Sequence, residues 1–552
     1  MLINRKLIWG LILLVIIVNG IGVFEPLLRN DDPVLYANIA KHMAVSGDWI
    51  GLFSAGQPWL DKPHFPFWIS AFSFKIFGIN AFAYFLPGYL FHLLGAYYTY
   101  RLAKLLYNAE VGLIALLIYL SSVHLMLSGS FDVRAEAYLL GQIMPACYYW
   151  LLYDRSSSWK PLVLASFFTA LAMMTKGLFV VVTIFSGLVF TWIYTKQYAR
   201  IISPKWLLAY ALSLLFILPE LICLYLQFDA QPATMVFGHK NISGLSWYFW
   251  GSQFGRFFNS GPIVNTHGNP LFFVHTYLWA FLPWSLVFIA ASYMAIRHFK
   301  ANTAVDKAKL VYLLASFWLT FIMFSATKFQ LDHYTNIIMP FAAILCASYL
   351  NRKFELKRIA QFQFGLSGLI LLLNIGITLY LFNSSWLILF ALVPGSLLIW
   401  MFKPQQFSYL ERSLVFPSLA ISAFFGLALL VNFAICRTYD VGYNLAAQIN
   451  AKPLAQTYDL HTGWLPLEFY TQGQFSHVEN GADLPSTGAY YVAMKQAAWQ
   501  NNQYQLNLQQ FALETTFCGN TIDRVIPYYA DKNQLATHLE CFVVVKHVNK
   551  IK

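Results

Sequence analysis

Charged residues are scarce in this sequence. Only 11% of its 552 residues are Asp, Glu, Lys or Arg, whereas 58% are hydrophobic and the mean hydropathy is +0.55. Soluble domains carry about 25% charged residues, so this composition excludes an ordinary soluble protein. Apolar runs near the length that crosses a ~30 Å hydrocarbon core recur over the first 435 residues. The composition therefore predicts an α-helical polytopic membrane protein.

Several motifs are also missing. Neither a zinc-type cysteine spacing nor a phosphate-binding glycine loop occurs, so we expect no nucleotide cofactor. No internal repeat is evident, which argues against a repeat-built transporter. No small-x-small cleavage site follows the apolar run Leu7–Phe24, so we interpret this run as the first membrane span and not as a signal peptide.

The apolar runs predict about thirteen membrane spans. They are 7–24, 81–100, 111–128, 133–152, 160–174, 178–195, 206–226, 271–296, 310–326, 334–350, 362–382, 386–402 and 413–435. An odd number of spans places the two ends of the chain on opposite sides of the membrane. Clusters of Lys and Arg all fall on the side that holds the N-terminus, and such a bias marks the cytoplasmic side.

This orientation places the C-terminus on the outer side of the membrane, which is the periplasm for a bacterial inner-membrane protein. The segments 25–80 and 227–270 then form long outward loops within a transmembrane domain, 1–435. Residues 436–552 are more polar and contain strand-like runs at 489–494 and 541–548, so we expect a small α/β domain there. The net charge of +12 follows from the topology, and we do not interpret it as nucleic-acid binding.

Two adjacent carboxylates, Asp31 and Asp32, follow the first predicted span. Asp32 precedes Pro33 and the helix-like stretch Val34–Val45, which is typical of a helix start. A carboxylate at this place also fits a general base that takes a proton from an acceptor hydroxyl. The two interpretations are compatible.

The segment Leu60–His64 lies in the same outward loop, between aromatic and proline residues that stiffen it. It is either a polar turn or a binding site, and the cost of charge beside a membrane favours a site. Lys62 is suited to bind a phosphate as a point charge. Asp61 and His64 are candidate metal ligands.

Other ionisable residues stand at the outer ends of predicted spans, where charge is costly. Asp132, Arg134 and Glu136 open one span, and a local Arg–Glu pair is the alternative explanation. Lys176 and Lys328 lie on the side that is depleted in positive charge; an anionic ligand explains both, and snorkelling to lipid headgroups is the alternative.

The second long loop adds Arg256 and His267, although a single loop histidine is more often solvated than a ligand. All of these candidates converge on one face of the bundle. Cations and carboxylates under outward loops, above a hydrophobic bundle, suit a substrate with a lipid tail and an anionic phosphate head.

The order of these motifs resembles glycosyltransferase family 39 and the related lipid A aminoarabinose and protein O-mannosyl transferases, which are integral-membrane GT-C enzymes. The resemblance covers residues 1 to about 435. It is carried by the acidic motif before Tyr36–Trp49, the Leu-Asp-Lys-Pro segment, and the runs that contain Glu136, Lys176 and Tyr334.

The resemblance implies a polyprenyl-phosphate sugar donor, inversion at the sugar carbon, and a divalent metal such as Zn, Mg or Mn. By register, Asp32 matches the catalytic aspartate and Glu136 the second acidic site. Lys62 and Tyr334 match phosphate-contacting residues. Asp61 stands where relatives have a metal-binding glutamate, and His267 is similar to its loop partner.

The sequence departs from the resemblance at Pro33 and Leu35, and at Asp61, which is one methylene shorter than the glutamate of the relatives. The arginine that would help to hold the phosphate is replaced by Leu35, and Arg134 or Arg256 is a candidate substitute. Lys328 and Lys176 complete the predicted set of cations around the phosphate.

We therefore expect an inverting glycosyltransferase that acts on lipid A or another envelope glycolipid. A protein O-glycosyltransferase and a flippase for an anionic polyprenyl lipid are the alternatives. The sequence leaves the sugar, the acceptor and the pairing of Cys518 with Cys541 open.

Overall fold

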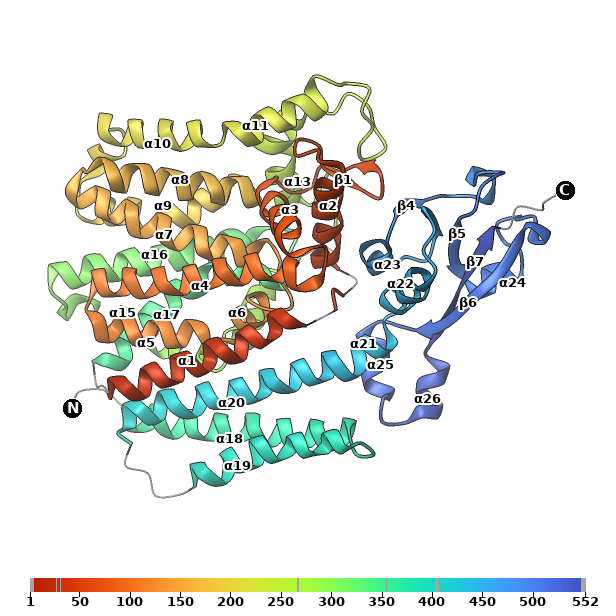
Figure 1. Ribbon diagram of the computed structural model, residues 1–552. Coiled ribbons are helices and arrows are strands. Elements are labelled where there is room, and N and C mark those ends of the chain that lie inside the picture. Colours follow the sequence, from red (N-terminus) through yellow and green to blue (C-terminus); the bar gives the residue numbers. More distant parts are fainter. Residues whose placement is uncertain are drawn as a thin grey trace.

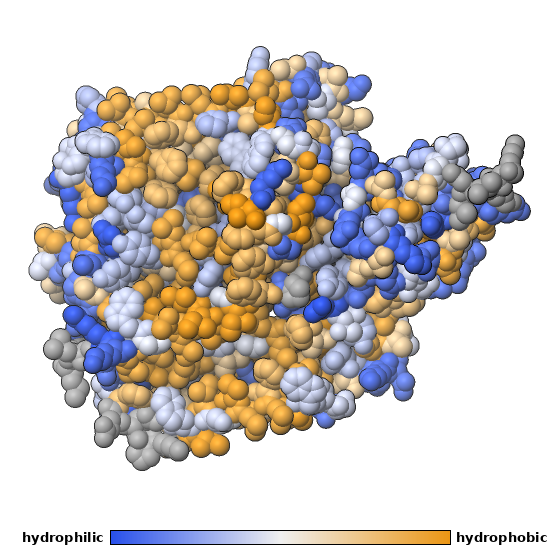
Figure 2. Space-filling view, in the orientation of Figure 1, coloured by the Kyte–Doolittle hydropathy of each residue, from blue (hydrophilic) through white to orange (hydrophobic). Residues whose placement is uncertain are grey.

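The computed structural model describes residues 4–25, 27–29, 31–265, 268–352, 356–402 and 407–547. Long helices run side by side in a bundle, and a smaller domain with a β-sheet projects from the end opposite to the N-terminus (Figure 1). Hydrophobic residues cover much of the bundle surface in the face that Figure 2 shows, whereas the sheet domain is largely hydrophilic. Exposed apolar side chains such as Leu13, Ile17, Leu369 and Leu373 belong to this surface. The molecule therefore has the surface of a membrane protein.

Every predicted span coincides with a helix or with two consecutive helical segments. The unbroken ones are α1 Arg5–Ile21, α4 Ala81–Leu106, α7 Ala135–Ser156, α8 Trp159–Lys176, α9 Val180–Tyr194, α16 Ala304–Ala326 and α18 Leu356–Leu381. The others combine α5 Ala109–Leu120 with α6 Val123–Ser128, α10 Pro204–Phe216 with α11 Leu218–Leu224, α14 Phe272–Ala280 with α15 Ser285–Arg297, a 3₁₀-helix Asp332–Ile338 with α17 Met339–Asn351, a 3₁₀-helix Trp386–Ala391 with α19 Leu392–Met401, and α20 Tyr409–Val431 with a π-helix Asn432–Cys436.

Fewer of these segments are single apolar rods of membrane-spanning length. Within the described ranges, four single helices are long and apolar enough to cross a membrane. The number rises to six if each of two bent helix pairs counts as one span. The bent pairs are Pro204–Phe216 with Leu218–Asp229, at 42°, and Phe272–Ala280 with Ser285–Arg297, at 115°. The structure is thus mostly helical with several spans, and the number thirteen stays a prediction.

The first outward loop folds into α2 Asp32–Ser46, a hairpin of β1 Phe53–Ser54 and β2 Gln57–Pro58, and α3 Phe65–Phe77. The predicted helical stretch Val34–Val45 lies inside α2. The residue that caps α2 is Asp31, because its side chain accepts a hydrogen bond from the Asp32 amide at 2.8 Å. The helix start expected at Asp32 and Pro33 is thus confirmed, and since Asp31 supplies the capping side chain, the Asp32 carboxylate is left to point elsewhere.

The second outward loop folds into short helical turns. They are a π-helix Tyr225–Asp229, α12 Gly244–Ser246, a second π-helix Trp247–Gly251 and α13 Ser252–Phe258. α13 carries Arg256 towards the first outward loop, where it meets Asp61. The two loops therefore build one structure above the bundle.

The sheet domain follows α20 through α21 Arg437–Tyr439 and α22 Val441–Ala451. Its five strands lie in the order β4-β3-β5-β7-β6, with β3 parallel to β4 and β5, and β7 antiparallel to β5 and β6. Their bounds are β3 Gln456–Leu460, β4 Gln474–His477, β5 Tyr491–Lys495, β6 Phe511–Gly519 and β7 Glu540–His547. The helices between and after them are α23 Leu465–Tyr470, α24 Gln496–Gln500, α25 Ile522–Val525 and α26 Lys532–Thr537.

This domain confirms the predicted small C-terminal α/β fold. β5 and β7 overlap the two strand-like runs that the sequence suggested, and Cys518 and Cys541 form a disulfide between β6 and β7. The side chains of β5 alternate between two apolar clusters: Tyr491 packs with α22, and Val492 packs on the opposite face. Such alternation is expected of a sheet with both faces covered.

α23 of the sheet domain docks on α2. The Lys41 ammonium donates hydrogen bonds to the carbonyls of Glu468, Phe469 and Thr471 at 2.7, 3.0 and 2.8 Å. The Asn38 amide donates to the Glu468 carboxylate at 3.1 Å. These carbonyls lie at the C-terminal end of α23, where a cation is favourable. The sheet domain therefore holds the helix on which Asp32 stands.

Candidate active site

A cavity at the end of the bundle next to the sheet domain collects five of the ten predicted site residues. Its polar wall contains Asp61 and Lys62 from the first loop, Lys176 from the end of α8, Arg256 from α13 and Tyr334. Four phenylalanines, Phe179, Phe257, Phe324 and Phe329, form an aromatic part of the remaining wall, which also contains Ser252, Gln253 and Thr327. A cationic pocket with apolar walls suits a phosphate group that is attached to a hydrocarbon chain.

Asp61 sits between two cations. Its carboxylate accepts a hydrogen bond from the Lys62 ammonium at 2.5 Å and another from the Arg256 guanidinium. Burial alone would raise the pKa of Asp61, but the charges of Lys62 and Arg256 hold it below its usual value. The pKa of Lys62 is lowered mainly by burial and further by the positive charge of the neighbouring Arg256. This cluster carries two positive charges and one negative charge, so it keeps a net positive charge for an anion.

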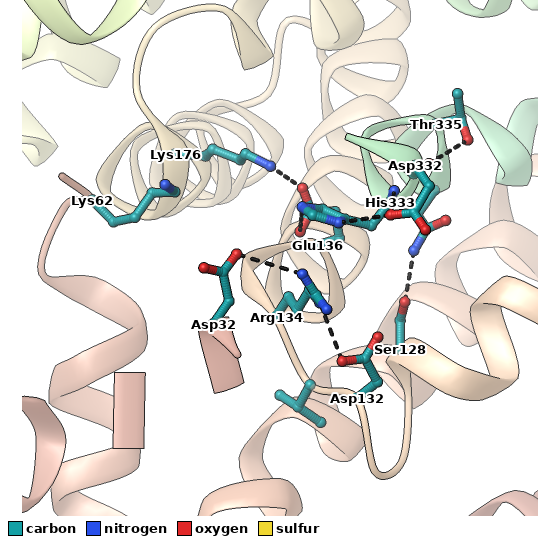
Figure 3. A network of polar contacts seen from close by, with 12 residues as sticks. Asp32, Lys62, Ser128, Asp132, Arg134, Glu136, Lys176, Asp332, His333 and Thr335 are labelled. Carbon is teal, nitrogen blue, oxygen red and sulfur yellow. Dashed lines mark hydrogen bonds and ion pairs between the residues drawn. The ribbon is translucent and has the colours of Figure 1, made fainter. Parts of the chain in front are cut away.

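Asp32 stands at the start of α2, close to this cluster. Figure 3 shows its carboxylate between Lys62 and Arg134, and its Oδ2 lies 3.6 Å from the Arg134 guanidinium. Arg134 also binds Asp31 at 2.5 Å and Asp132 at 3.1 Å. About a third of the Asp32 side chain is exposed, which leaves it accessible to a substrate.

Arg134 therefore holds carboxylates in place. It contacts three acids, and it is not among the residues that line the cavity. Arg256 does line the cavity and approaches from the opposite loop. Of the two candidate substitutes for the missing arginine, Arg256 is the one that the geometry places beside Lys62.

Glu136 and Lys176 form a buried ion pair at the inner side of the cavity (Figure 3). The Lys176 ammonium also lies 4.1 Å from the centre of the Tyr334 ring, which is a cation–π distance. The second oxygen of Glu136 lies 3.9 Å from Nε2 of His333. The side chains of Glu136 and Lys176 are almost completely buried, so each of the two charges depends on the other for compensation.

A polar chain continues from His333 into the bundle. Its Nδ1 lies 3.2 Å from the Asp332 carboxylate, and the other oxygen of Asp332 lies 3.9 Å from His124. His124 bonds Asn336 at 2.7 Å, and the amide of Asn336 donates to Ser128 at 2.6 Å. Sequence reasoning missed His124, Ser128 and Asn336. The available signal was the presence of polar side chains inside predicted spans.

His64 has a different role from the predicted one. Its Nδ1 lies 3.0 Å from Glu220, its Nε2 lies 2.8 Å from the Ile50 carbonyl, and both side chains of the ion pair are fully buried. The interpretation of His64 as a metal ligand is therefore wrong, because both ring nitrogens are occupied. Sequence reasoning missed Glu220, although a carboxylate inside an apolar run is itself a signal.

The described residues do not fit a metal site at Asp61. Its two oxygens face Lys62 and Arg256, and in the described part of the chain no group of three His, Cys, Asp or Glu side chains is placed to hold a metal ion. The predicted partner His267 lies outside the described residues. The divalent metal stays an untested prediction, and no step below depends on it.

Lys328 lies outside the cavity wall. Its side chain is exposed, and its backbone bonds to Phe257 at 3.0 Å and to Gly268 at 2.7 Å, which ties α13 to the segment that begins at Gly268. Taken together, the site offers the cations Lys62 and Arg256, with one carboxylate between them, to an anion, and the accessible carboxylate of Asp32 to a proton. This combination can support displacement of a phosphate by a hydroxyl.

Comparisons with known proteins agree with this arrangement. Residues 61–223 match the family described as dolichyl-phosphate-mannose-protein mannosyltransferase. An undecaprenyl phosphate-α-4-amino-4-deoxy-L-arabinose arabinosyl transferase 2 from Proteus mirabilis is 28% identical over 342 residues, which are 60% of this chain and 57% of the relative. The corresponding transferase from Edwardsiella ictaluri is 25% identical over 331 residues, 59% of this chain and 56% of the relative. The matches thus span little more than half the length of these relatives.

Solved structures extend the likeness to the whole chain. The crystal structure of ArnT from Cupriavidus metallidurans bound to undecaprenyl phosphate has a TM-score of 0.75 and 16% identity, and the match covers 99% of each chain. An oligosaccharyltransferase from Archaeoglobus fulgidus has a TM-score of 0.51 and 12% identity, over 90% of this chain and 70% of that one. The chain therefore has the fold of ArnT, and the predicted resemblance to the GT-C membrane glycosyltransferases is confirmed.

Proposed function

We propose that this protein is an inverting glycosyltransferase that moves a sugar from a polyprenyl-phosphate donor to an envelope acceptor. The observation that carries the proposal is the cavity in which Lys62, Arg256 and Tyr334 meet, with Asp32 beside it. The relatives whose names specify undecaprenyl phosphate-linked aminoarabinose support the donor class. Lipid A is the acceptor class that the resemblance favours.

The chemistry follows from the charges. The donor phosphate lies against Lys62 and Arg256, with Tyr334 as a further contact, and its hydrocarbon chain follows the aromatic wall. When the bond between the anomeric carbon and the phosphate oxygen breaks, the cations neutralise the charge that develops on the leaving phosphate. Positioned charges of this kind commonly provide the largest share of the rate enhancement.

Asp32 acts as the general base in this scheme. It takes the proton of the acceptor hydroxyl, whose oxygen attacks the anomeric carbon from the face opposite to the phosphate, so the configuration inverts. A positioned base contributes about 10²- to 10⁴-fold. Arg134 holds Asp31 and Asp32 at the start of α2 and so fixes the direction of the carboxylate.

The location of the reaction follows from the charge bias of the connections. Lys and Arg gather at the end of the bundle that holds the N-terminus, which favours the cytoplasm for that end. α13, which carries the cavity residue Arg256, lies at the other end, towards the sheet domain (Figure 1). We therefore place the transfer on the periplasmic face of a bacterial inner membrane.

The experiment compares the wild-type chain with Asp32→Asn in cells whose envelope is analysed by mass spectrometry. We expect the wild-type chain to add a sugar to lipid A, and Asp32→Asn to reduce the addition at least 100-fold while expression and folding are kept. Asp48→Asn is the matched control, because Asp48 lies in the same loop and its carboxylate only accepts hydrogen bonds from the amides of Ile50 and Gly51.

The same experiment separates the alternatives. Sugar on Ser or Thr of envelope proteins instead of lipid A would indicate a protein O-glycosyltransferase, which the matched family description favours. A flippase would move the donor without releasing polyprenyl phosphate. Near-normal transfer by Asp32→Asn would overturn the role of Asp32, and the absence of polyprenyl phosphate release would overturn the transferase.

A further inference from the structure

A second cavity lies at the opposite end of the bundle, far from Asp32. It has a volume of about 240 Å³ and is enclosed by α15, by residues 301–302 after it, by α16 and by α17. Its inner wall is apolar: Ala291 and Ala295 on α15 face Leu310 and Leu345. The cavity exists because α15 presents alanines where larger side chains would close the gap. Nothing in the proposed transferase mechanism uses it.

The mouth of this cavity is polar and basic. Arg352, His298 and Asn302 stand there, and the Arg352 guanidinium donates to the Asn302 amide oxygen at a long 3.3 Å. The neighbouring connection from residue 297 to 309 contains four Lys or Arg side chains and one acid, Asp306. That acid is bound by Lys309 at 3.2 Å and by Thr303 at 3.0 Å. The mouth therefore carries a net positive charge.

The cavity also adjoins surface that faces lipid. Ile289, Tyr293 and Ile296 lie on the outer face of α15 and are at least half exposed, although each is large and apolar. A chain from the bilayer thus has a short route around α15 into the gap. Basic pockets between transmembrane helices on the cytoplasmic side commonly hold anionic lipid headgroups.

We propose that this cavity binds an anionic phospholipid, with its phosphate at Arg352 and part of one acyl chain between α15 and α17. A phosphate offers Arg352 two charge-assisted hydrogen bonds in place of one long bond to a neutral amide, and such bonds are about twice as strong. The acyl chain fills apolar space that is otherwise empty. Since α17 follows directly after the 3₁₀-helix that carries Tyr334, the bound lipid also steadies the helix behind the first cavity. The inference does not depend on the proposed transferase activity.

The test uses the full-length protein in a neutral detergent and native mass spectrometry. Phosphatidylglycerol and phosphatidylcholine with identical acyl chains are added in turn. We expect the wild-type protein to retain phosphatidylglycerol at least about tenfold better. Arg352→Gln should lose this preference, and Ala295→Leu should lose retention of the lipid because its side chain fills the cavity. Lys160→Gln is the control: it removes an exposed charge from the same end of the bundle without touching the cavity.

Three outcomes would overturn the proposal. Equal retention by the wild type, Arg352→Gln and Ala295→Leu would show that the lipid lies elsewhere. Loss of the lipid in Lys62→Gln but not in Arg352→Gln would place it in the first cavity. Displacement by inorganic phosphate, with Ala295→Leu unaffected, would reveal a simple anion site. If Arg352→Gln does not fold, Ala295→Leu and Ala291→Leu decide the question through the acyl chain.

Discussion

Ion pairs at the cavity and ion pairs on the sheet domain differ in burial. At the cavity, the side chains of Asp61 and Lys62 are only 19% and 10% exposed, and Glu136 and Lys176 are nearly inaccessible. On the sheet domain, Lys452 is 76% exposed in its pair with Glu514. Burying charge costs several kcal/mol per ion, whereas an exposed pair contributes about 0–1 kcal/mol. The cavity pairs therefore carry a much larger desolvation cost than the exposed pair, and each buried charge depends on its partner.

The largest effect is expected at Glu136 and Lys176. Lys176→Met leaves the Glu136 carboxylate buried with only His333 nearby, and removal of one partner of a buried pair costs about 3–5 kcal/mol. Denaturant unfolding in detergent measures the loss.

The double variant Lys176→Met with Glu136→Gln is the control, since it removes both charges and should recover part of the lost stability. If the single and the double variants were equally unstable, the loss would come from packing. An unpaired buried charge would then not explain the instability of Lys176→Met.

A smaller effect is expected at Lys62, and it depends on pH. Lys62→Met should weaken donor binding about 10- to 100-fold, which corresponds to one hydrogen bond to a charged group. Because burial lowers the pKa of Lys62 below its usual value of 10.5, the wild-type cation is lost at a lower pH than that of a free lysine. Donor binding is then fully present below this pKa and falls as the pH rises through it.

Lys62→Arg sharpens this prediction, since arginine keeps its charge at alkaline pH. We expect the alkaline limb of kcat/KM for the donor to move to higher pH in this variant. An alkaline limb that is the same in Lys62→Arg and in the wild type would assign the titration to another group.

The next smaller effect is expected at the interface between α2 of the bundle and α23 of the sheet domain. Lys41→Gln removes at least one of the three hydrogen bonds to the end of α23, because an amide has two donors, and an unpaired buried carbonyl costs about 1–3 kcal/mol. We expect faster proteolysis at the connection near residue 437 and slower transfer, because α2 positions Asp32.

Lys240→Gln is the matched control for Lys41→Gln, because Lys240 is exposed on the second outward loop. Unchanged proteolysis and transfer in Lys41→Gln would show that the sheet domain does not fix α2.

The sequence predicted which side chains gather at the cavity better than it predicted how they pair. Asp32, Lys62 and Arg256 were found because ionisable groups beside a membrane are costly, and Tyr334 was found through the resemblance. The partners were not found, because the bond from Glu220 to His64 spans 156 positions and depends on how the loops pack. For the same reason, the sequence suggested a metal at Asp61 where the structure places two cations.

For the helices too, the sequence predicted local features but not those that depend on packing. Apolar runs located every predicted span on helical residues, because hydrophobicity is a local property of the chain. The 115° bend between α14 and α15 was not predicted, although Pro283 stands in the connection and removes a backbone donor there. A bend depends on the helices around it, and no local pattern reports those neighbours.

The smallest effect is expected at the exposed pair of Lys452 and Glu514. Lys452→Gln should change the free energy of unfolding by no more than about 0.5 kcal/mol, since water and salt screen both charges. Any difference from the wild type should vanish when unfolding is measured in 1 M salt (where the Debye length is about 3 Å), whereas the loss in Lys176→Met should persist there. The two salt responses test the cause of the difference between the regions. If 1 M salt also reduced the loss of unfolding free energy in Lys176→Met, water and ions would reach Glu136. Burial would then not explain why the charges at the cavity are paired.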